Sequence, residues 1–223
     1  MRRFKVTDIA YGIIFTLLFI SIAVVITVNF RPLYYMDIKL LNIEATSGLD
    51  RDTIKKNYDA LIDYSSPFFR GDLKFPSLDS SENGLIHFSE VKNIFTAFYI
   101  IGAICLVLGI IIIFLKSKKK DYSYLMVSAI TAVVLPLLLA IYMAIDFDRA
   151  FVVFHKIFFR NDYWLFDPVT DPVITILPDE FFMHCAIMII LIVLFFSLLF
   201  ILIYKKAKRH TGIRYRKIKG LNL

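Results

Sequence analysis

The sequence lacks the short motifs that mark several common classes of enzyme. Its 223 residues contain no GxSxG turn, no P-loop, no HExxH pair and no CxxC pair. These absences exclude the nucleophile elbow of many hydrolases, the phosphate-binding loop of P-loop NTPases, the zincin metal site and a dithiol redox site. The sequence therefore offers no recognisable serine or cysteine nucleophile.

Cysteine itself is rare, because Cys105 and Cys185 are the only two in the chain. Both lie inside long apolar runs. A helical rise of about 1.5 Å per residue places them at membrane depths that differ by about 12 Å. That separation is too large for a disulfide, so we expect both cysteines to be packing residues.

Charge is absent from four long stretches of the sequence. None of them contains Asp, Glu, Lys or Arg: residues 9–30, 93–115, 122–145 and 181–204. Each exceeds the roughly 20 residues that a membrane-spanning helix needs. The chain is 58% hydrophobic with a mean hydropathy of +0.68, far above the range of soluble domains. We therefore predict an all-α membrane protein with four transmembrane helices.

The predicted first helix follows the basic start MRRFK, as the apolar region of a signal peptide does. It is too long for a signal peptide and is followed by no small-residue cleavage site, so we expect it to be retained. All four runs also lack the ionisable side chain at midplane that a coupled transporter normally needs. Transport is therefore disfavoured.

The net charge of +7 is distributed unevenly between the segments that flank these runs. Residues 1–8, 116–121 and 205–223 hold 15 of the 26 lysines and arginines and only two acids. The two long loops, residues 31–92 and 146–180, hold 17 acids. The positive-inside rule predicts that the three basic segments are cytoplasmic and that both long loops are extracellular. We expect membrane lipids and no nucleic acid as partners, since the basic tail is explained by topology.

The first outer loop is long enough for a small cap. Residues 36–45 alternate partly between apolar and polar side chains, which predicts a strand. Residues 50–64 predict a helix, with these side chains on one side: Ile54, Tyr58, Leu61 and Ile62. We therefore predict that the two outer loops together form a small extracellular α/β cap.

The second outer loop contains the only tryptophan and a short amphipathic pattern. Aromatic residues and one histidine recur at helical spacing: Phe151, Phe154, His155, Phe158 and Phe159. We predict a short helix with Asp148 as N-cap that ends near Asn161. Its aromatic face, which includes His155, would lie at the membrane boundary, where Tyr163 and Trp164 also prefer to be.

The chain has four histidines, and their positions differ. His210 lies in the basic tail, where we expect it to be solvated. His184 lies one turn inside the fourth apolar run, where a hydrogen-bonded packing role is expected. His87 and His155 belong to different loops but meet the membrane at the same face and depth. A single loop histidine is usually a surface residue, whereas two at one boundary favour a functional site.

Three stretches carry a resemblance to a known family. They are NYDALIDYSSPFF at residues 57–69, IHFSEVKNIF at residues 86–95, and AFVVFHKIFFRNDYWLFDP with ILPDEFF in residues 150–182. Together they resemble the bacterial lipoprotein intramolecular transacylases, and the resemblance covers nearly the whole chain and both histidines. Phe88 follows His87 where the family leads us to expect methionine, a change that leaves the imidazole in place.

The resemblance implies a substrate and a reaction. The substrate is a diacylated lipoprotein whose amino-terminal cysteine bears an S-diacylglyceryl group. Its sn-2 acyl chain moves to the cysteine α-amine and leaves an N-acyl, S-monoacylglyceryl lyso form, in the bacterial plasma membrane. We expect His87 and His155 to provide acid–base catalysis without a cofactor or metal. Five aromatic residues would accommodate the acyl chains: Phe151, Phe154, Phe158, Tyr163 and Trp164.

Two other classes of function stay open from the sequence. The chain could be a non-enzymatic membrane partner whose outer loops are a docking surface and whose histidines sense pH. It could also be a metallohydrolase that uses His87, His155 and a carboxylate such as Asp162. Zinc sites usually contain a closely spaced pair of ligands, which the sequence does not show.

Overall fold

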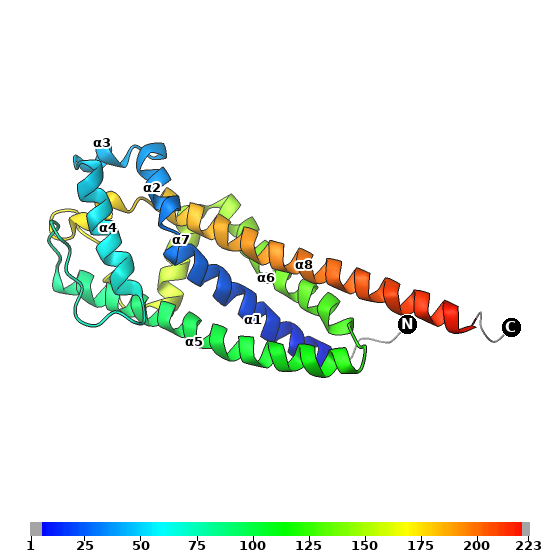
Figure 1. Cartoon of the computed structure of the whole chain (residues 1–223). Helices are drawn as coiled ribbons and strands as arrows, with labels where there is room; N and C mark the ends of the chain where they lie inside the picture. The colour runs from blue at the N-terminus through cyan, green and yellow to red at the C-terminus, as the bar shows by residue number, and fades with distance from the viewer. Residues whose placement is uncertain (1–5, 220–223) are drawn as a thin grey trace. The chain divides into compact units, whose positions relative to one another are not determined.

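The structure is a computed structural model in which residues 6–219 are described, and it is helical throughout that range (Figure 1). The side chains of residue 135 and of residues 210–219, His210 among them, lie outside the description. The elements follow the chain in this order: α1 (Val6–Asn29), α2 (Arg31–Leu40), α3 (Ile43–Ser47), α4 (Arg51–Ser65), α5 (Glu82–Lys118), α6 (Ser123–Ile145), α7 (Phe147–Phe158), the 3₁₀ helix η1 (Pro172–Ile176) and α8 (Asp179–Lys219).

The four predicted spanning segments lie in four long helices, α1, α5, α6 and α8. Each of these helices is long and apolar enough to cross a membrane. The helix α5 has 37 residues, which corresponds to about 55 Å. A bilayer core is only about 30 Å thick. The helix is therefore long enough for its charge-free run, residues 93–115, to cross the membrane while its first turns extend beyond it.

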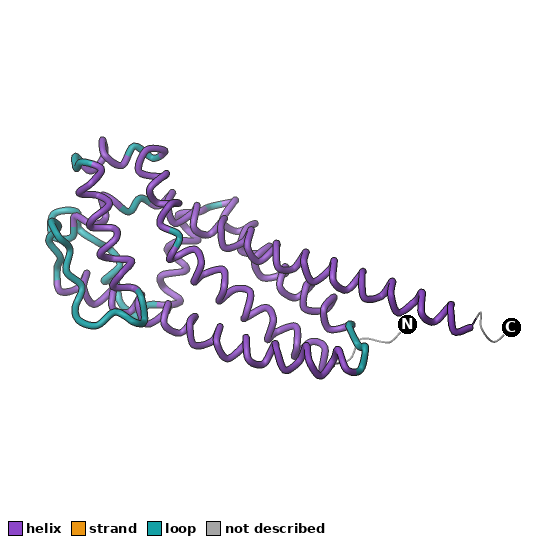
Figure 2. Tube along the Cα trace, in the orientation of Figure 1, coloured by secondary structure: helices purple, strands orange, loops and turns teal. Residues whose placement is uncertain are grey.

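The predicted α/β cap is wrong, because residues 6–219 contain no strand (Figure 2). Residues 36–45 lie in α2 and α3, which are separated at Asn42, a residue with a left-handed φ of 53°. Tyr34, Asp37 and Ile38 are all buried, at spacings of three and four residues. This spacing places them on one side of a helix, and it outweighs the partial alternation that suggested a strand.

The helix predicted over residues 50–64 is confirmed as α4. Its N-cap is Asp50, whose carboxylate accepts hydrogen bonds from the backbone N–H groups of Asp52 and Thr53 at 3.0 Å. Three of the four side chains predicted to share one face are buried: Ile54, Tyr58 and Leu61. The fourth, Ile62, is half-buried and packs against the same core.

The chain divides into two compact units. The first unit comprises the described parts of Met1–Ile22, Ile101–Leu139 and Ile190–Leu223, and the second comprises Ala23–Ile100 and Ala140–Ile189. The four long helices contribute residues to both units, whereas α2, α3, α4, α7 and η1 belong to the second alone.

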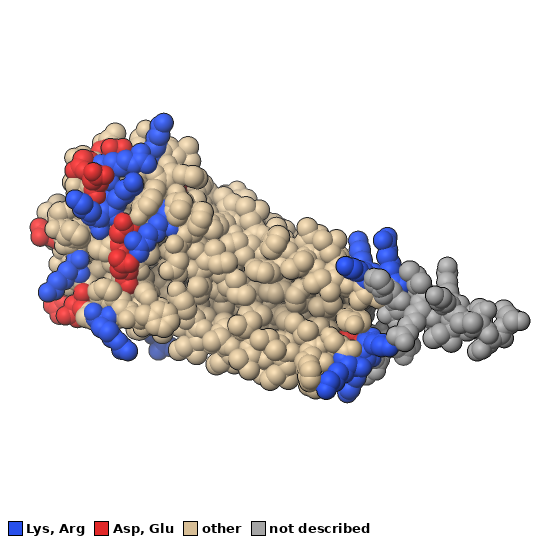
Figure 3. All heavy atoms as spheres, viewed as in Figure 1, with Lys and Arg blue, Asp and Glu red and all other residues tan. Residues whose placement is uncertain are grey.

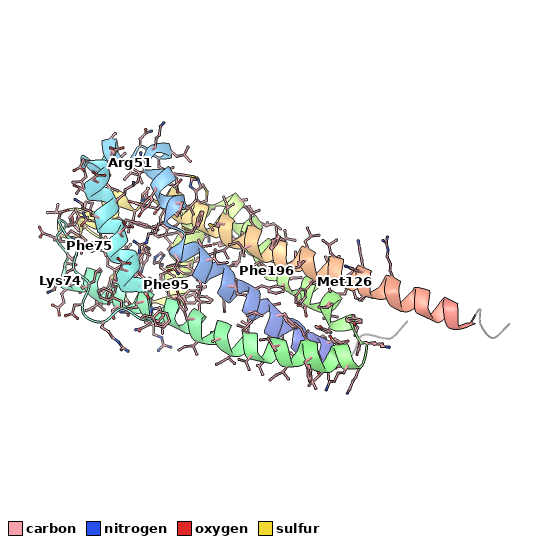
Figure 4. The ribbon with its side chains drawn as sticks, in the orientation of Figure 1. Arg51, Lys74, Phe75, Phe95, Met126 and Phe196 are labelled. Atoms are coloured by element: carbon pink, nitrogen blue, oxygen red, sulfur yellow. The ribbon has the colours of Figure 1, made fainter. Side chains whose placement is uncertain are left out.

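Aromatic rings form the core of the first unit. Phe15 and Phe19 of α1 each pack edge-on against Phe200 of α8, at centroid distances of 5.0 and 4.9 Å. Phe196, labelled in Figure 4, stacks on Phe19 at 5.3 Å. These contacts hold α1 and α8 together along their apolar faces.

A cluster of charged and hydroxyl groups completes the first unit. Lys116 Nζ lies 3.2 Å from Asp8 Oδ1 and 3.1 Å from Asp121 Oδ2, and Ser123 Oγ donates to Asp121 at 2.7 Å. Burial alone would raise the pKa of Asp121, but the hydrogen bonds from Ser123 and Lys116 outweigh it and hold that pKa at about 2. The buried charges of this unit are therefore paired with each other.

The second unit is organised around a stacked pair of tyrosines. Tyr34 of α2 and Tyr58 of α4 lie parallel at 3.7 Å, and Phe181 of α8 packs edge-on against both. The Tyr34 hydroxyl donates to the carbonyl of Ile176 in η1 at 2.6 Å. This core connects both long loops to the start of α8.

The surface of the second unit is charged. On the face shown in Figure 3, charged side chains of both signs gather over α2, α3 and α4.

Candidate active site

The helix that carries His155 is α7 in the second unit. It begins at Phe147, and its N-cap is Asp146, whose carboxylate accepts from the Arg149 backbone N–H at 2.9 Å. The predicted N-cap, Asp148, is therefore wrong by two residues, because it lies in the first helical turn. There its negative charge still faces the positive end of the helix dipole. The helix ends at Phe158 and Phe159 is extended, so its end lies three residues before the expected position.

The predicted aromatic face of α7 divides into two. Phe151, His155 and Phe159 follow each other at four-residue spacing, and His155 and Phe159 are 8% and 5% exposed. Phe154 and Phe158 are instead 46% and 50% exposed and pack on each other at 4.7 Å. The five predicted positions span a wider arc than the side of α7 that packs against the rest of the unit. Only Phe151, His155 and Phe159 are therefore turned inward.

The surroundings of His155 assign its tautomer. Its ring lies 4.1 Å from Phe151 and stacks at 4.6 Å and 26° on Trp164. His155 Nδ1 lies 2.8 Å from the Phe151 carbonyl oxygen, which can only accept, so Nδ1 carries the hydrogen and Nε2 has a free lone pair. Burial lowers the pKa of His155, and the Phe151 carbonyl and the charge of Asp179 oppose this only partly. Burial therefore favours the neutral form of the His155 imidazole.

The structure brings His87 and His155 together, although 67 residues separate them in the sequence. Their ring centroids are 6.0 Å apart, and His87 is only 5% exposed. His87 packs edge-on against Phe159 at 4.7 Å and Phe166 at 5.5 Å. Two positive rings at this distance in an apolar environment would repel each other, so the pair readily holds at most one proton.

Three buried polar atoms at this site have no hydrogen-bond partner within the described residues. They are His87 Nδ1, Glu90 Oε2 and Trp164 Nε1. Glu90 follows His87 by three residues on α5, and Trp164 stacks on His155. Buried polar groups are nearly always satisfied in folded proteins, so a polar group that reached these three atoms would be stabilised there.

Comparison with known proteins identifies the family. The family model of the lipoprotein intramolecular transacylase Lit matches residues 9–182. A solved structure of Lit from Bacillus cereus superposes with a TM-score of 0.89 at 37% sequence identity, covering 93% of this chain and 98% of that one. This chain belongs to the lipoprotein intramolecular transacylase family.

Two other Bacillus cereus Lit structures, in which one histidine is replaced by arginine or by alanine, are also similar. The arginine variant has a TM-score of 0.82 at 38% identity and covers 93% of this chain and 92% of its own. The alanine variant has a TM-score of 0.85 at 37% identity and covers 92% of this chain and 94% of its own. A search of the curated proteins gave no match. The four-helix architecture and the membrane setting predicted from the sequence agree with these relatives.

Glu90 and Asn161 belong to the candidate site in this structure, and the sequence interpretation did not select them. Asn161 Nδ2 donates to Glu90 Oε1 at 2.9 Å, and Asn161 Oδ1 accepts from the Tyr163 backbone N–H at 3.1 Å. Asn161 therefore links α5 to the segment that carries Trp164. The available signal was the three-residue spacing of His87 and Glu90, which places both on one side of a helix.

A close backbone approach positions the start of α5 in the transacylase. Asp171 is 3% exposed, and its Oδ1 accepts from the Ser81 backbone N–H at 2.8 Å. A Cβ atom on Gly84 would lie 2.2 Å from Asp171 Oδ1 and 3.2 Å from the Phe166 ring. A side chain at Gly84 would force Asp171 or Phe166 to shift. Glycine therefore lets the segment that carries these two residues pack on the first turn of α5, just before His87. Phe88 completes this contact by stacking on Phe166 at 5.3 Å.

Two further residues named from the sequence differ in exposure. Tyr163 is half-buried, whereas Asp162, the carboxylate of the metallohydrolase alternative, is exposed. Among the described side chains, no group of three or more His, Cys, Asp or Glu residues is placed to hold a metal ion. The hydrogen-bonded packing role predicted for His184 is confirmed, because its Nδ1 lies 2.9 Å from Asp37 Oδ2.

Proposed function

We propose that this protein moves the sn-2 acyl chain of an S-diacylglyceryl cysteine to the α-amine of the same cysteine, at the amino terminus of a bacterial lipoprotein. The observation that carries this proposal is the buried pair of His87 and His155 in a chain of the transacylase family. One acyl C–N bond forms and one acyl C–O bond breaks. One proton leaves the nitrogen and one arrives at the glyceryl oxygen.

The protein supplies proton transfer and positioning in this mechanism. The nucleophile is the amine of the substrate, which explains why the chain needs no serine or cysteine nucleophile. Amine and ester belong to one molecule, so holding them in contact supplies much of the acceleration as effective molarity. His155 Nε2, the free acceptor, removes the proton from the amine. The resulting imidazolium protonates the departing alkoxide through His87, whose Nδ1 is unpartnered.

Aromatic side chains bind the acyl chains and exclude water. Phe151 and Trp164 enclose His155, so little water reaches the acyl carbon and hydrolysis is suppressed. The exposed pair of Phe154 and Phe158 offers an apolar surface to acyl chains at the membrane boundary, with Tyr163 beside it in sequence. The unpartnered Trp164 Nε1–H is a donor for the oxyanion of the tetrahedral intermediate.

The charge distribution supports the orientation of this site. The positive-inside rule places residues 1–8, 116–121 and 205–223 in the cytoplasm and puts residues 31–92 and 146–180 outside. His87 and His155 then lie at the extracellular boundary of the bacterial plasma membrane. Lipoproteins carry their diacylglyceryl anchor in that leaflet when they face outward, so substrate and site share one depth.

The test is mass spectrometry of amino-terminal lipopeptides. Purified protein incubated with a synthetic S-diacylglyceryl-cysteine lipopeptide should yield a product of unchanged mass whose fragments carry an acyl group on nitrogen. Cells with the gene should contain the same lyso form, and cells without it should not. Substrate binding without conversion would contradict the proposal and favour a non-enzymatic partner.

A further inference from the structure

Glu90 is only half satisfied within the described structure. Its Oε1 accepts a hydrogen bond from Asn161, and its Oε2 is buried without a partner. Leaving an acceptor of a carboxylate unpaired in a buried position is costly, and proteins seldom retain one without use. The hydrogen bond from Asn161 restrains the Glu90 side chain through Oε1 and leaves Oε2 available. A carboxylate oxygen in this situation can accept a hydrogen bond from a cation.

The nearest cation along the chain is engaged elsewhere. Lys92 Nζ donates to the Phe69 carbonyl at 3.2 Å and lies 4.4 Å from the centre of the Tyr64 ring. Among the described residues, no lysine or arginine forms an ion pair with Glu90 at 4.0 Å or less. The described residues thus provide a buried carboxylate oxygen near the histidine pair and no positive group that pairs with it.

The substrate of the proposed reaction carries the missing group. Its amino-terminal cysteine has an α-ammonium with three N–H donors, one of which must face a base. Glu90 lies one helical turn from His87, so a cation bound to Glu90 Oε2 is adjacent to the histidine pair. We propose that Glu90 Oε2 binds the terminal ammonium of the lipoprotein and holds it against His87 and His155. This inference rests on the proposed function.

The same contact distinguishes substrate from product. The substrate nitrogen is a cation, and its charge-assisted hydrogen bond to a carboxylate is among the stronger kinds. After transfer the nitrogen is an uncharged amide, so the attraction to Glu90 is lost while the acyl chains remain. Glu90 is a binding residue, not a proton carrier. The bound ammonium first gives one proton to the histidine pair, which releases it to solvent, and the free amine then attacks the ester. The second proton leaves the nitrogen as the acyl C–N bond forms and reaches the glyceryl oxygen through the histidines. Loss of this attraction assists product release.

The experiment measures binding without turnover. Two lipopeptides are made with ether-linked alkyl chains in place of the esters, so neither can react; one has a free amine and the other an N-acetyl group. The wild-type protein should bind the amine analogue about 10-fold or more tightly than the acetylated one, as expected for a hydrogen bond to a charged group. In Glu90→Gln, which keeps an acceptor for Asn161, this preference should disappear.

The controls separate charge recognition from general damage. Glu82→Gln makes the same chemical change at an exposed position on the same helix and should keep the full preference. A Glu90→Gln protein that still prefers the amine, or a wild-type protein that binds both analogues equally, overturns the inference. A wild-type protein that shows the preference but makes no lyso product would instead contradict the proposed reaction.

Discussion

Two histidine sites in the second unit differ in the chemical nature of their partners. At the first, His184 of α8 lies with its Nδ1 2.9 and 3.0 Å from the two carboxylate oxygens of Asp37, which is 1% exposed. At the second, His87 and His155 face each other at 6.0 Å, and His87 Nδ1 has no described partner. One pair combines an acid with a base, and the other combines two bases.

The difference between these two histidine sites suggests a structural role for one and a chemical role for the other. The His184–Asp37 contact joins an imidazole to a buried carboxylate and links α2 to α8. A pair of imidazoles enclosed by aromatic rings leaves a lone pair and a ring nitrogen available, and burial favours its neutral form. This difference is why we propose the pair of His87 and His155, and not His184, as the reactive site.

The largest expected effect follows from removing either member of the reactive pair. His87→Ala and His155→Ala should each reduce turnover by about 10²–10⁴-fold, because each interrupts general acid–base transfer. The double variant should be little slower than either single variant, since both histidines serve one relay. The rates are measured by conversion of the diacylglyceryl-cysteine lipopeptide. Losses that multiply in the double variant would indicate two independent roles.

A smaller but selective effect is expected at Trp164. Trp164→Phe preserves an aromatic ring to stack on His155 and removes only the unpartnered N–H. If this donor stabilises the oxyanion, kcat should fall by about 10²–10³-fold with KM nearly unchanged. Steady-state kinetics with the lipopeptide check this. A Phe variant with wild-type kcat and a Trp164→Ala variant with raised KM would leave Trp164 as an acyl-chain contact alone.

The carboxylate-bound histidine should respond in the opposite way. His184→Ala leaves the Asp37 carboxylate buried without a partner, which costs about 3–5 kcal/mol of stability for broken buried pairs. Thermal unfolding in detergent should show a lower midpoint, while kcat of the folded fraction stays near that of the wild type. His184→Ala combined with Asp37→Asn should recover part of the loss. A normal midpoint with a lost kcat would reverse the roles assigned to the two sites.

The pH dependence should reveal the neutral state of His155. Its pKa in the folded protein is lowered below the ordinary value of 6.5, so protonation favours the unfolded chain. The stability that His155 contributes is complete above pH 6.5 and is lost as the pH falls from there through the lowered pKa. Compared with His155→Gln, the wild type should lose more stability between pH 6.5 and pH 5, as unfolding midpoints would show. Equal slopes would contradict the lowered pKa.

Much of the fold follows from local sequence, because its main signals are local. The absence of charge over four runs is a property of each run, and each lies in a long apolar helix. The strand expected at residues 36–45 was wrong because burial of Tyr34 and Ile38 depends on partners in α4, η1 and α8. Alternation over ten residues cannot show which side chains those partners will cover.

The candidate site was predictable only where its signals are local in the sequence. His87 and His155 stood out because both were expected to meet the membrane at the same face and depth, and because His155 falls on the aromatic face of a predicted helix. Glu90 did not stand out, since its role depends on the hydrogen bond from Asn161, 71 residues away. The split between the inner residue Phe151 and the exposed pair, Phe154 and Phe158, likewise depends on which side of α7 the rest of the unit covers.

The most direct test compares one variant from each histidine site in one assay. His155→Ala and His184→Ala are incubated under the same conditions with the diacylglyceryl-cysteine lipopeptide, and the initial rate of formation of the N-acyl lyso form is measured by mass spectrometry. His155→Ala should form this product at least about 100-fold more slowly than His184→Ala, corrected for the folded fraction. If His155→Ala forms it at the wild-type rate, the buried histidine pair is a packing feature and the proposed mechanism is wrong.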